Sequence, residues 1–190
     1  FTVTISDGSV TLSATTLAQV NKVKASTKGA VTATITGGQS NVGSLSTGTS
    51  DPIALTVSDA VTAAQGKTAT DKTSSGTITL SGGISDSFAG LTNGSGLSTN
   101  LSTLKDHLGN SSTALVINAN ATMSSANDVT ALNTVTALAA ITGTSGGANT
   151  ITGTSTLLKD LNAHGNKFSV KLSFSDTVTA GNIASNVNPI

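Results

Sequence analysis

Polar and apolar residues alternate in seven short segments of the chain, and these segments are rich in Val, Ile and Thr. Alternation with a period of two is typical of half-buried β-strands, and β-branched residues favour the same structure. The expected strands are residues 2–6, 30–36, 53–58, 77–81, 114–118, 149–152 and 168–173.

Between these segments, apolar residues recur at the three- and four-residue spacing of an amphipathic helix. The clearest helix is predicted over residues 97–108, whose apolar stripe consists of Leu97, Leu101, Leu104 and Leu108. Gly109 follows as the expected C-cap, because glycine readily adopts the left-handed conformation needed there.

Weaker helical patterns lie between other pairs of expected strands. Thr62 and Gln65 have the spacing of a capping box at the start of a helix over 62–72. The remaining patterns are Leu17 with Val20 and Val23; Val129, Leu132, Val135, Leu138 and Ile141; and Leu157, Leu158 and Leu161, ended by Gly165.

Strands that alternate with helices of about ten residues pair in parallel through right-handed crossovers. The strand starts average near 28 residues apart, which is the turn length of an α/β solenoid. The predicted fold is therefore an α/β repeat, a solenoid of parallel strands with short crossover helices. The alternative is an all-β solenoid or sandwich in which the weak helices are loops, because Ser, Thr and Gly lower helix propensity.

An internal repeat supports this architecture. Residues 1–11, 53–62, 114–122 and 168–179 each read as a strand, then Asp or Asn, then Thr. A second match pairs Lys105-Asp106 with Lys159-Asp160, 54 residues later. The predicted repeats are residues 1–52, 53–113 and 114–167, with 168–190 starting a partial fourth repeat of one continuous solenoid.

The sequence ends on a segment that resembles the one on which it begins. The chain starts on a repeat strand, and its last segment copies the start of the first repeat. We therefore expect a piece of a longer array, or a subunit whose ends stack head to tail on other copies. The simpler interpretation is one domain with an old internal duplication.

The composition narrows the class of function. There is no Arg, Glu, Cys, Trp or Tyr, whereas 34 Thr and 27 Ser are present. Enzymes rarely dispense with so many reactive side chains, so the sequence predicts a non-catalytic protein. The net charge of zero argues against nucleic acid as a partner, and no apolar stretch is long enough to span a membrane. A neutral, hydroxyl-rich surface favours an extracellular or cell-surface location.

Four polar residues that follow repeat strands are the candidate metal ligands: Asp7, Asp59, Asn120 and Asp176. Carboxylate and amide oxygens suit calcium, which takes six to eight oxygen ligands. One or two carboxylates per turn are few for such a shell, and Asp and Asn also cap helices and form turns. The capping role is the favoured interpretation, calcium remains the alternative, and no other cofactor is predicted.

Other candidate sites are weaker. His107 and His164 occupy related places near helix ends, where a positive charge suits the helix dipole, and no third ligand supports a metal pair. The string Gly143–Gly147 resembles the nucleophile segment of trypsin-like proteases, but without a placed base and acid it is predicted to be a loop. The Thr-x-Thr steps raise the alternative of ice binding, although outward strand positions simply favour Thr.

The strings at residues 29–37, 57–65 and 131–143 resemble repeat regions of giant secreted or cell-surface proteins of marine cyanobacteria, and related strings occur in phage structural proteins. The resemblance implies an extracellular, repetitive, non-catalytic protein and carries over no functional residue. The expected function is a structural segment of a surface, sheath or filament-forming protein. The alternative is an adhesin or phage-fibre module that binds glycans or cells, with Phe88 as its candidate binding residue.

Overall fold

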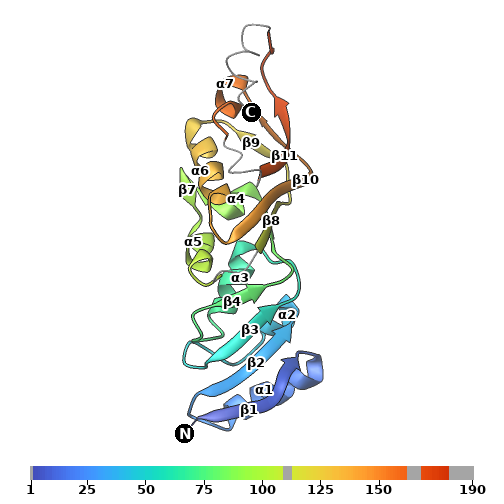
Figure 1. The fold of residues 1–190 in the computed structure, drawn as a ribbon, viewed down its shortest axis with the longest axis vertical. Coiled ribbons are helices and arrows are strands. Elements are labelled where there is room, and N and C mark those ends of the chain that lie inside the picture. The colour runs from blue at the N-terminus through green and yellow to red at the C-terminus, as the bar shows by residue number, and fades with distance from the viewer. Residues whose placement is uncertain (1, 109–112, 162–167, 180–190) are drawn as a thin grey trace. The chain divides into compact units, whose positions relative to one another are not determined.

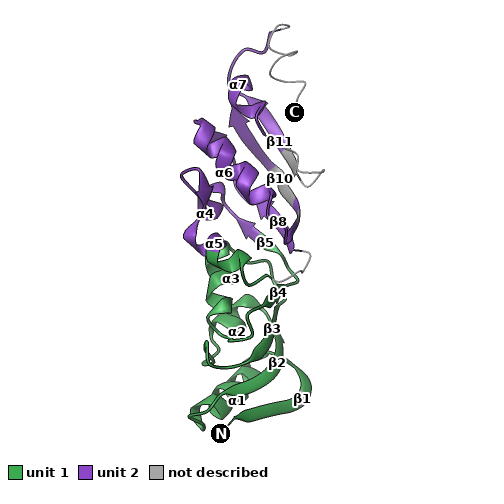
Figure 2. Cartoon of the chain, turned by 60° about the vertical axis from the view of Figure 1, so that its left-hand side comes forward, with its two compact units in different colours: residues 1–84, 103–111 green, residues 85–102, 112–190 purple. Residues whose placement is uncertain are grey.

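The computed structural model describes residues 2–108, 113–161 and 168–179, and the chain divides into two compact units. Unit 1 comprises residues 1–84 and 103–111, and unit 2 comprises residues 85–102 and 112–190 (Figure 2). Both units combine parallel strands with short helices.

The described residues of unit 1 form four strands and three complete helices, which Figure 1 labels. In chain order these are β1 (Val3–Thr11), α1 (Ala14–Ala25), β2 (Val31–Gly37), α2 (Gln39–Gly43), β3 (Ile53–Val57), α3 (Ala63–Thr70) and β4 (Ile78–Leu80). The sheet order is β1-β2-β3-β4, and every neighbouring pair is parallel. Consecutive strands are thus neighbours in space, as crossover connections predict.

One face of the unit 1 sheet forms the core, because inward and outward residues alternate along each strand. In β2, Val31, Ala33 and Ile35 are buried, whereas Thr34 is exposed. The helices lie on one side of the strands (green in Figure 2). Their buried residues, such as Val20 of α1 and Val42 of α2, complete the core.

Unit 2 has a similar mixture of elements. Its first strand, β5 (Ile84–Asp86), begins at the last residue of the first segment of unit 1. The elements that follow are α4 (Phe88–Leu91), β6 (Thr92–Asn93), β7 (Gly96–Leu97), β8 (Thr113–Ile117), β9 (Ala121–Met123), α6 (Ala126–Thr136), β10 (Ile141–Gly153), α7 (Ser155–Leu158) and β11 (Phe168–Phe174). Helix α5 (Thr99–Lys105) begins in unit 2 and ends in unit 1. The main sheet has the order β11-β10-β8-β5, and β9 also pairs with β10.

Strand β10 pairs in parallel with β8, β9 and β11. Strands β6 and β7 form a separate antiparallel hairpin, with Gly94 at a positive φ of 60° in the turn. Glycine tolerates that conformation without steric cost. Helix α6 starts at a capping box of Ser125 and Asp128 and buries Val129, Leu132 and Val135.

The structure confirms a mixed α/β class with parallel strands, and each of the seven expected strands overlaps an observed one. The all-β alternative is wrong, because α1, α3 and α6 are regular helices with capping boxes. Leu101, Leu104 and Leu108 are buried as the predicted stripe requires. Leu97, however, belongs to β7, since α5 starts at Thr99.

Strand boundaries differ most at β1 and β10. β1 continues to Thr11 through a register shift between Thr4 and Ser9, where Gly8 has a φ of 75°. β10 starts at Ile141, a residue that the helical pattern included, and therefore contains Gly143–Gly147. That string was predicted to be a loop, and the prediction is wrong, because backbone pairing with β8 and β11 needs no apolar alternation there.

The expected caps Gly109 and Gly165 lie outside the described residues, as does His164. Strands β5 and β9 were not predicted, because three residues are too few to show an alternating pattern.

Candidate functional site

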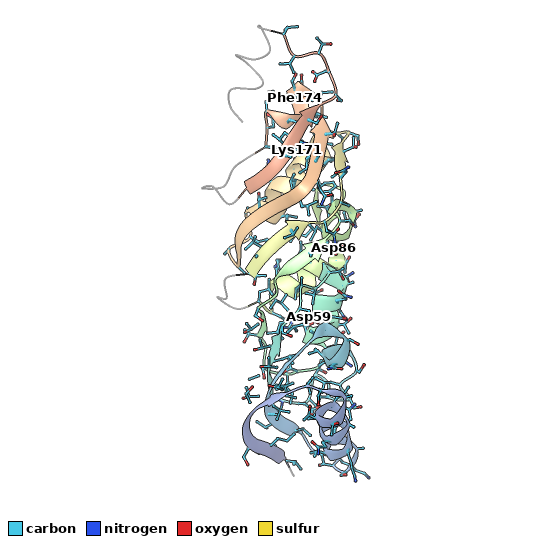
Figure 3. The ribbon with its side chains drawn as sticks, turned by 90° about the vertical axis from the view of Figure 1, so that its right-hand side faces the viewer. Asp59, Asp86, Lys171 and Phe174 are labelled. Carbon is cyan, nitrogen blue, oxygen red and sulfur yellow. The ribbon has the colours of Figure 1, made fainter. Side chains whose placement is uncertain are left out.

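Two of the four candidate acidic or amide residues perform the same structural task. Asp59 follows the end of β3 (Figure 3), and its Oδ2 accepts a hydrogen bond of 2.9 Å from the backbone N–H of Gln39. Asp176 follows β11, and its Oδ1 accepts a hydrogen bond of 2.7 Å from the backbone N–H of Ser155. Gln39 and Ser155 are the first residues of α2 and α7. Each carboxylate thus satisfies a free N–H at the start of the preceding helix.

The segments around these carboxylates correspond residue by residue. Residues 34–37 of β2 and 150–153 of β10 both read Thr-Ile-Thr-Gly. Gly37 pairs with Val57 two residues before Asp59, and Gly153 pairs with Phe174 two residues before Asp176. A strand–helix–strand–Asp module therefore occurs once in each unit.

Gly38 shows why Asp59 is needed in the first module. Gly38 is the N-cap of α2 and provides no side-chain hydrogen bond. A Cβ atom at Gly38 would lie 2.7 Å from Oδ2 of Asp59. The carboxylate therefore occupies the space of the missing cap side chain and accepts the N–H in its place.

The other two candidates do not join this arrangement. Asn120 accepts a hydrogen bond of 2.8 Å from the backbone N–H of Thr150, which lies within β10 and not at a helix start. Asp7 lies inside β1 at the register shift, although it was expected to follow the strand. Among the described residues, no three His, Cys, Asp or Glu side chains form a group that could hold a metal ion.

Hydrogen bonding affects the ionisation of Asp176. The side-chain hydroxyl of Ser155 donates a hydrogen bond of 2.7 Å to Oδ2, and with the backbone N–H it holds the pKa of Asp176 below its ordinary value. Asp128 likewise has a lowered pKa: burial opposes ionisation, but hydrogen bonds from Ser124 and Ser125 outweigh it. These carboxylates are thus stabilised as anions and act as hydrogen-bond acceptors.

We expect Asp59→Ala to lower the free energy of unfolding by about 1 kcal/mol, the typical effect of losing a helix cap. Asp59→Asn should retain part of that stability, because the amide oxygen still accepts from Gln39. Asp106→Ala is the matched control, since Asp106 lies at the surface and forms an ion pair with the adjacent Lys105. Urea unfolding followed by circular dichroism measures the effect, and equal losses at Asp59 and Asp106 would contradict the capping role.

The most buried charged side chain in the described part of the chain was not among the candidates. Asp51 has a side chain that is 0% exposed and lies 2.8 Å from Nζ of Lys24. Its carboxylate also accepts hydrogen bonds of 2.8 Å from the backbone N–H groups of Val31 and Gly48. Burial raises the pKa of Asp51, but these hydrogen bonds and Lys24 outweigh burial, so that the pKa lies below its ordinary value.

Threonine residues form a row across the outward face of the unit 1 sheet. Thr11 pairs with Thr36, Thr36 with Thr56, and Thr56 with Thr79. In unit 2, Thr152 pairs with both Thr122 and Ser173. Neighbouring strands lie about 4.8 Å apart, so each row is a regular ladder of hydroxyl and methyl groups. The two ladders line the outward sheet faces of the two units with hydroxyl groups.

The remaining described candidates lie in different elements of the chain. Phe88 is the first residue of α4 and is half-buried. His107 Nδ1 lies 2.9 Å from the carbonyl oxygen of Gly76, which gives the ring a structural contact. Ser145 lies in β10, where it pairs with Val116 and Ser169 in the adjacent strands.

No helix in the described part of the chain is both long and apolar enough to cross a membrane. Comparison with known proteins finds no matching family model, no matching curated protein and no matching solved structure.

Proposed function

We propose that this chain is a non-catalytic structural segment of a large extracellular surface, sheath or filament-forming protein. Its turns form one continuous solenoid, and its ends stack head to tail on further turns. The observation that carries the proposal is the repeated module, in which β2, α2, β3 and Asp59 of unit 1 match β10, α7, β11 and Asp176 of unit 2. Repetition of one building unit is typical of structural arrays.

Side chains that link successive turns support the same function. The Asn21 side chain donates to the Ser44 carbonyl and accepts from the Ser46 N–H, at 3.0 and 2.8 Å. In unit 2, Asn133 donates a hydrogen bond of 2.8 Å to the carbonyl oxygen of Asp160, 27 residues later. In both units, then, a neutral Asn side chain adds to strand pairing by linking successive strand–helix segments, which suits a structural array.

The composition also suits this role. The chain carries 34 Thr and 27 Ser but only nine Lys and nine Asp, so self-association would depend little on ionic strength. Salt at 1 M shortens the screening length to about 3 Å and weakens contacts between exposed charges, but it does not weaken apolar burial.

Negative-stain electron microscopy of the full chain at physiological and at molar salt tests the function. We expect uniform filaments in both conditions. Filaments that disperse in molar salt would show association through charges and would contradict the proposal. Dispersed particles of single-chain mass in both conditions would contradict end-to-end stacking.

A glycan- or cell-binding module is the second candidate. The partial exposure of Phe88 at the start of α4 favours it, because exposed aromatic rings stack on sugars. Loss of glycan or cell binding in Phe88→Ala would separate this function from a purely structural one.

A further inference from the structure

The first strand–helix pair of unit 1 has an incompletely buried apolar surface. Val3, Ile5 and Val10 of β1 are all half-buried. The inward apolar residues of β2, β3 and β4 are at most 6% exposed. The core thus continues to β1 but is not closed there.

Two adjoining hollows lie along this surface, with volumes of about 510 and 400 Å³. Both are lined by Gln19 and Val23 of α1, the first also by Ile5 and Val10 and the second by Val3. We call them together the β1–α1 groove. Among the described residues that line it, Lys22 is the only charged one.

Strand β1 is at the end of its sheet and, among the described residues, pairs only with β2. Its other edge therefore presents backbone N–H and C=O groups beside an apolar groove. Such an edge is a template for another strand. Within unit 1, the corresponding place beside each strand is filled by a parallel strand with alternating inward aliphatic residues.

We infer that the β1–α1 groove receives strand β11 of a second copy of this chain. The inference rests on the end-to-end stacking proposed above and identifies its two contact surfaces. Within the described part of the chain, β11 is at the end of its own sheet, and its inward residues Leu172 and Phe174 are half-buried. Lys171 and Phe174 both lie along this strand (Figure 3).

The chain itself shows that a strand of this sequence fits the sheet of unit 1. Residues 170–176, which begin in β11 and end at Asp176, read VKLSFSD, and residues 53–59, which begin in β3 and end at Asp59, read IALTVSD. Leu172 pairs with Ile151 as Leu55 pairs with Ile35. β11 therefore has the inward pattern of a strand that unit 1 already accepts.

The threonine rows define the register of the contact. Ser173 ends the row of unit 2 and Thr11 begins the row of unit 1. Placing Ser173 of one copy beside Thr11 of the next joins the two rows. It also places Leu172 next to Val10, so that apolar residues meet over the groove.

Cysteine cross-linking tests this register directly, because the chain has no Cys. Thr11→Cys and Ser173→Cys are prepared as separate full-length variants, mixed and treated with a mild oxidant. Adjacent parallel strands lie about 4.8 Å apart, within the Cα separation that a disulfide spans. We expect a disulfide-linked dimer in the mixture and none in either variant alone. Thr36→Cys mixed with Ser173→Cys is the matched control, since Thr36 lies in the interior strand β2.

The outcomes distinguish this inference from the proposed function. Filaments without the Thr11–Ser173 cross-link would overturn the docking of β11 but leave the structural function intact. A cross-link in the Thr11→Cys variant alone would indicate a symmetric contact between two β1 edges and would also overturn it. Absence of both filaments and cross-link would contradict both the structural function and the docking of β11.

As an independent measurement, Val10→Asp should abolish association while circular dichroism shows the fold retained. Undiminished association would overturn the role of the groove.

Discussion

Replacing Asp51 by alanine is expected to lower the free energy of unfolding by about 3 kcal/mol. The substitution leaves Lys24 without its anion, and it leaves the backbone N–H groups of Val31 and Gly48 without their acceptor. Breaking a buried pair by removing one partner costs more than the pair itself contributes, because the remaining polar groups stay desolvated. Chemical unfolding followed by far-UV circular dichroism measures the loss, since the chain has no Trp or Tyr for fluorescence.

Asp71→Ala provides the control for this prediction. Asp71 forms an ion pair with Lys67, but their side chains are 49% and 38% exposed. Exposed pairs of this kind contribute at most about 0.5 kcal/mol. A loss at Asp51 as small as that at Asp71 would show that the buried carboxylate is not important for stability.

The effect of Asp51 also has a defined dependence on pH. The pKa of Asp51 is lower in the folded chain than in the unfolded chain, where it is about 3.9. As pH falls, the unfolded state therefore takes up the proton first. The stabilising contribution is complete above that value and is lost as pH falls through the folded-state pKa. The difference in free energy of unfolding between the wild-type chain and Asp51→Ala should accordingly shrink below about pH 4. A difference that grows in acid would contradict a lowered pKa of Asp51 in the folded chain.

Ile35→Ala is expected to lower the free energy of unfolding by about 3 to 4 kcal/mol. Ile35 is 0% exposed and lies in β2, between β1 and β3. Truncation removes three buried carbon atoms and leaves a cavity that two flanking strands prevent from closing. Chemical unfolding of the full chain measures the change.

Thr34→Ala is the matched substitution on the opposite face of the same strand. Thr34 is exposed, so its replacement should change stability by less than about 1 kcal/mol. Similar losses of unfolding free energy at positions 34 and 35 would contradict the arrangement in which Ile35 points inward and Thr34 points outward.

The alternating pattern was sufficient to locate the strands of unit 1, because inward residues there are aliphatic and outward residues are mostly Thr. The same reasoning failed at β10, where the string from Gly143 to Gly147 carries no alternation, although Thr144 and Ser145 within it pair with both neighbouring strands. Backbone hydrogen bonds to two neighbours hold such a segment in the sheet, and no property of its side chains reveals them.

The sequence also predicted that Asp59 and Asp176 are equivalent, since each ends a strand of the same repeat. It placed Asp7 and Asn120 in the same group, and the structure separates them. Gly8 allows β1 to shift register and continue past Asp7. The backbone N–H of Asn118 donates to a carbonyl of the neighbouring strand, as those of Ser58 and Ser175 do. Asp59 and Asp176 each come directly after that residue. Asn120 lies two residues after Asn118, and so is one residue too far from β8 to occupy the corresponding place.

The sequence by itself located parts of seven strands, indicated a parallel α/β class and established the hydroxyl-rich composition, because these follow from local periodicity and residue counts. Tertiary structure alone decided which residues meet: Asp59 with the start of α2, Asp51 with Lys24, and the four threonines of one row. Lys24 and Asp51 are 27 residues apart and neither has a local signal of pairing. Their contact depends on the register between strands and the length of each crossover, which only the folded chain defines.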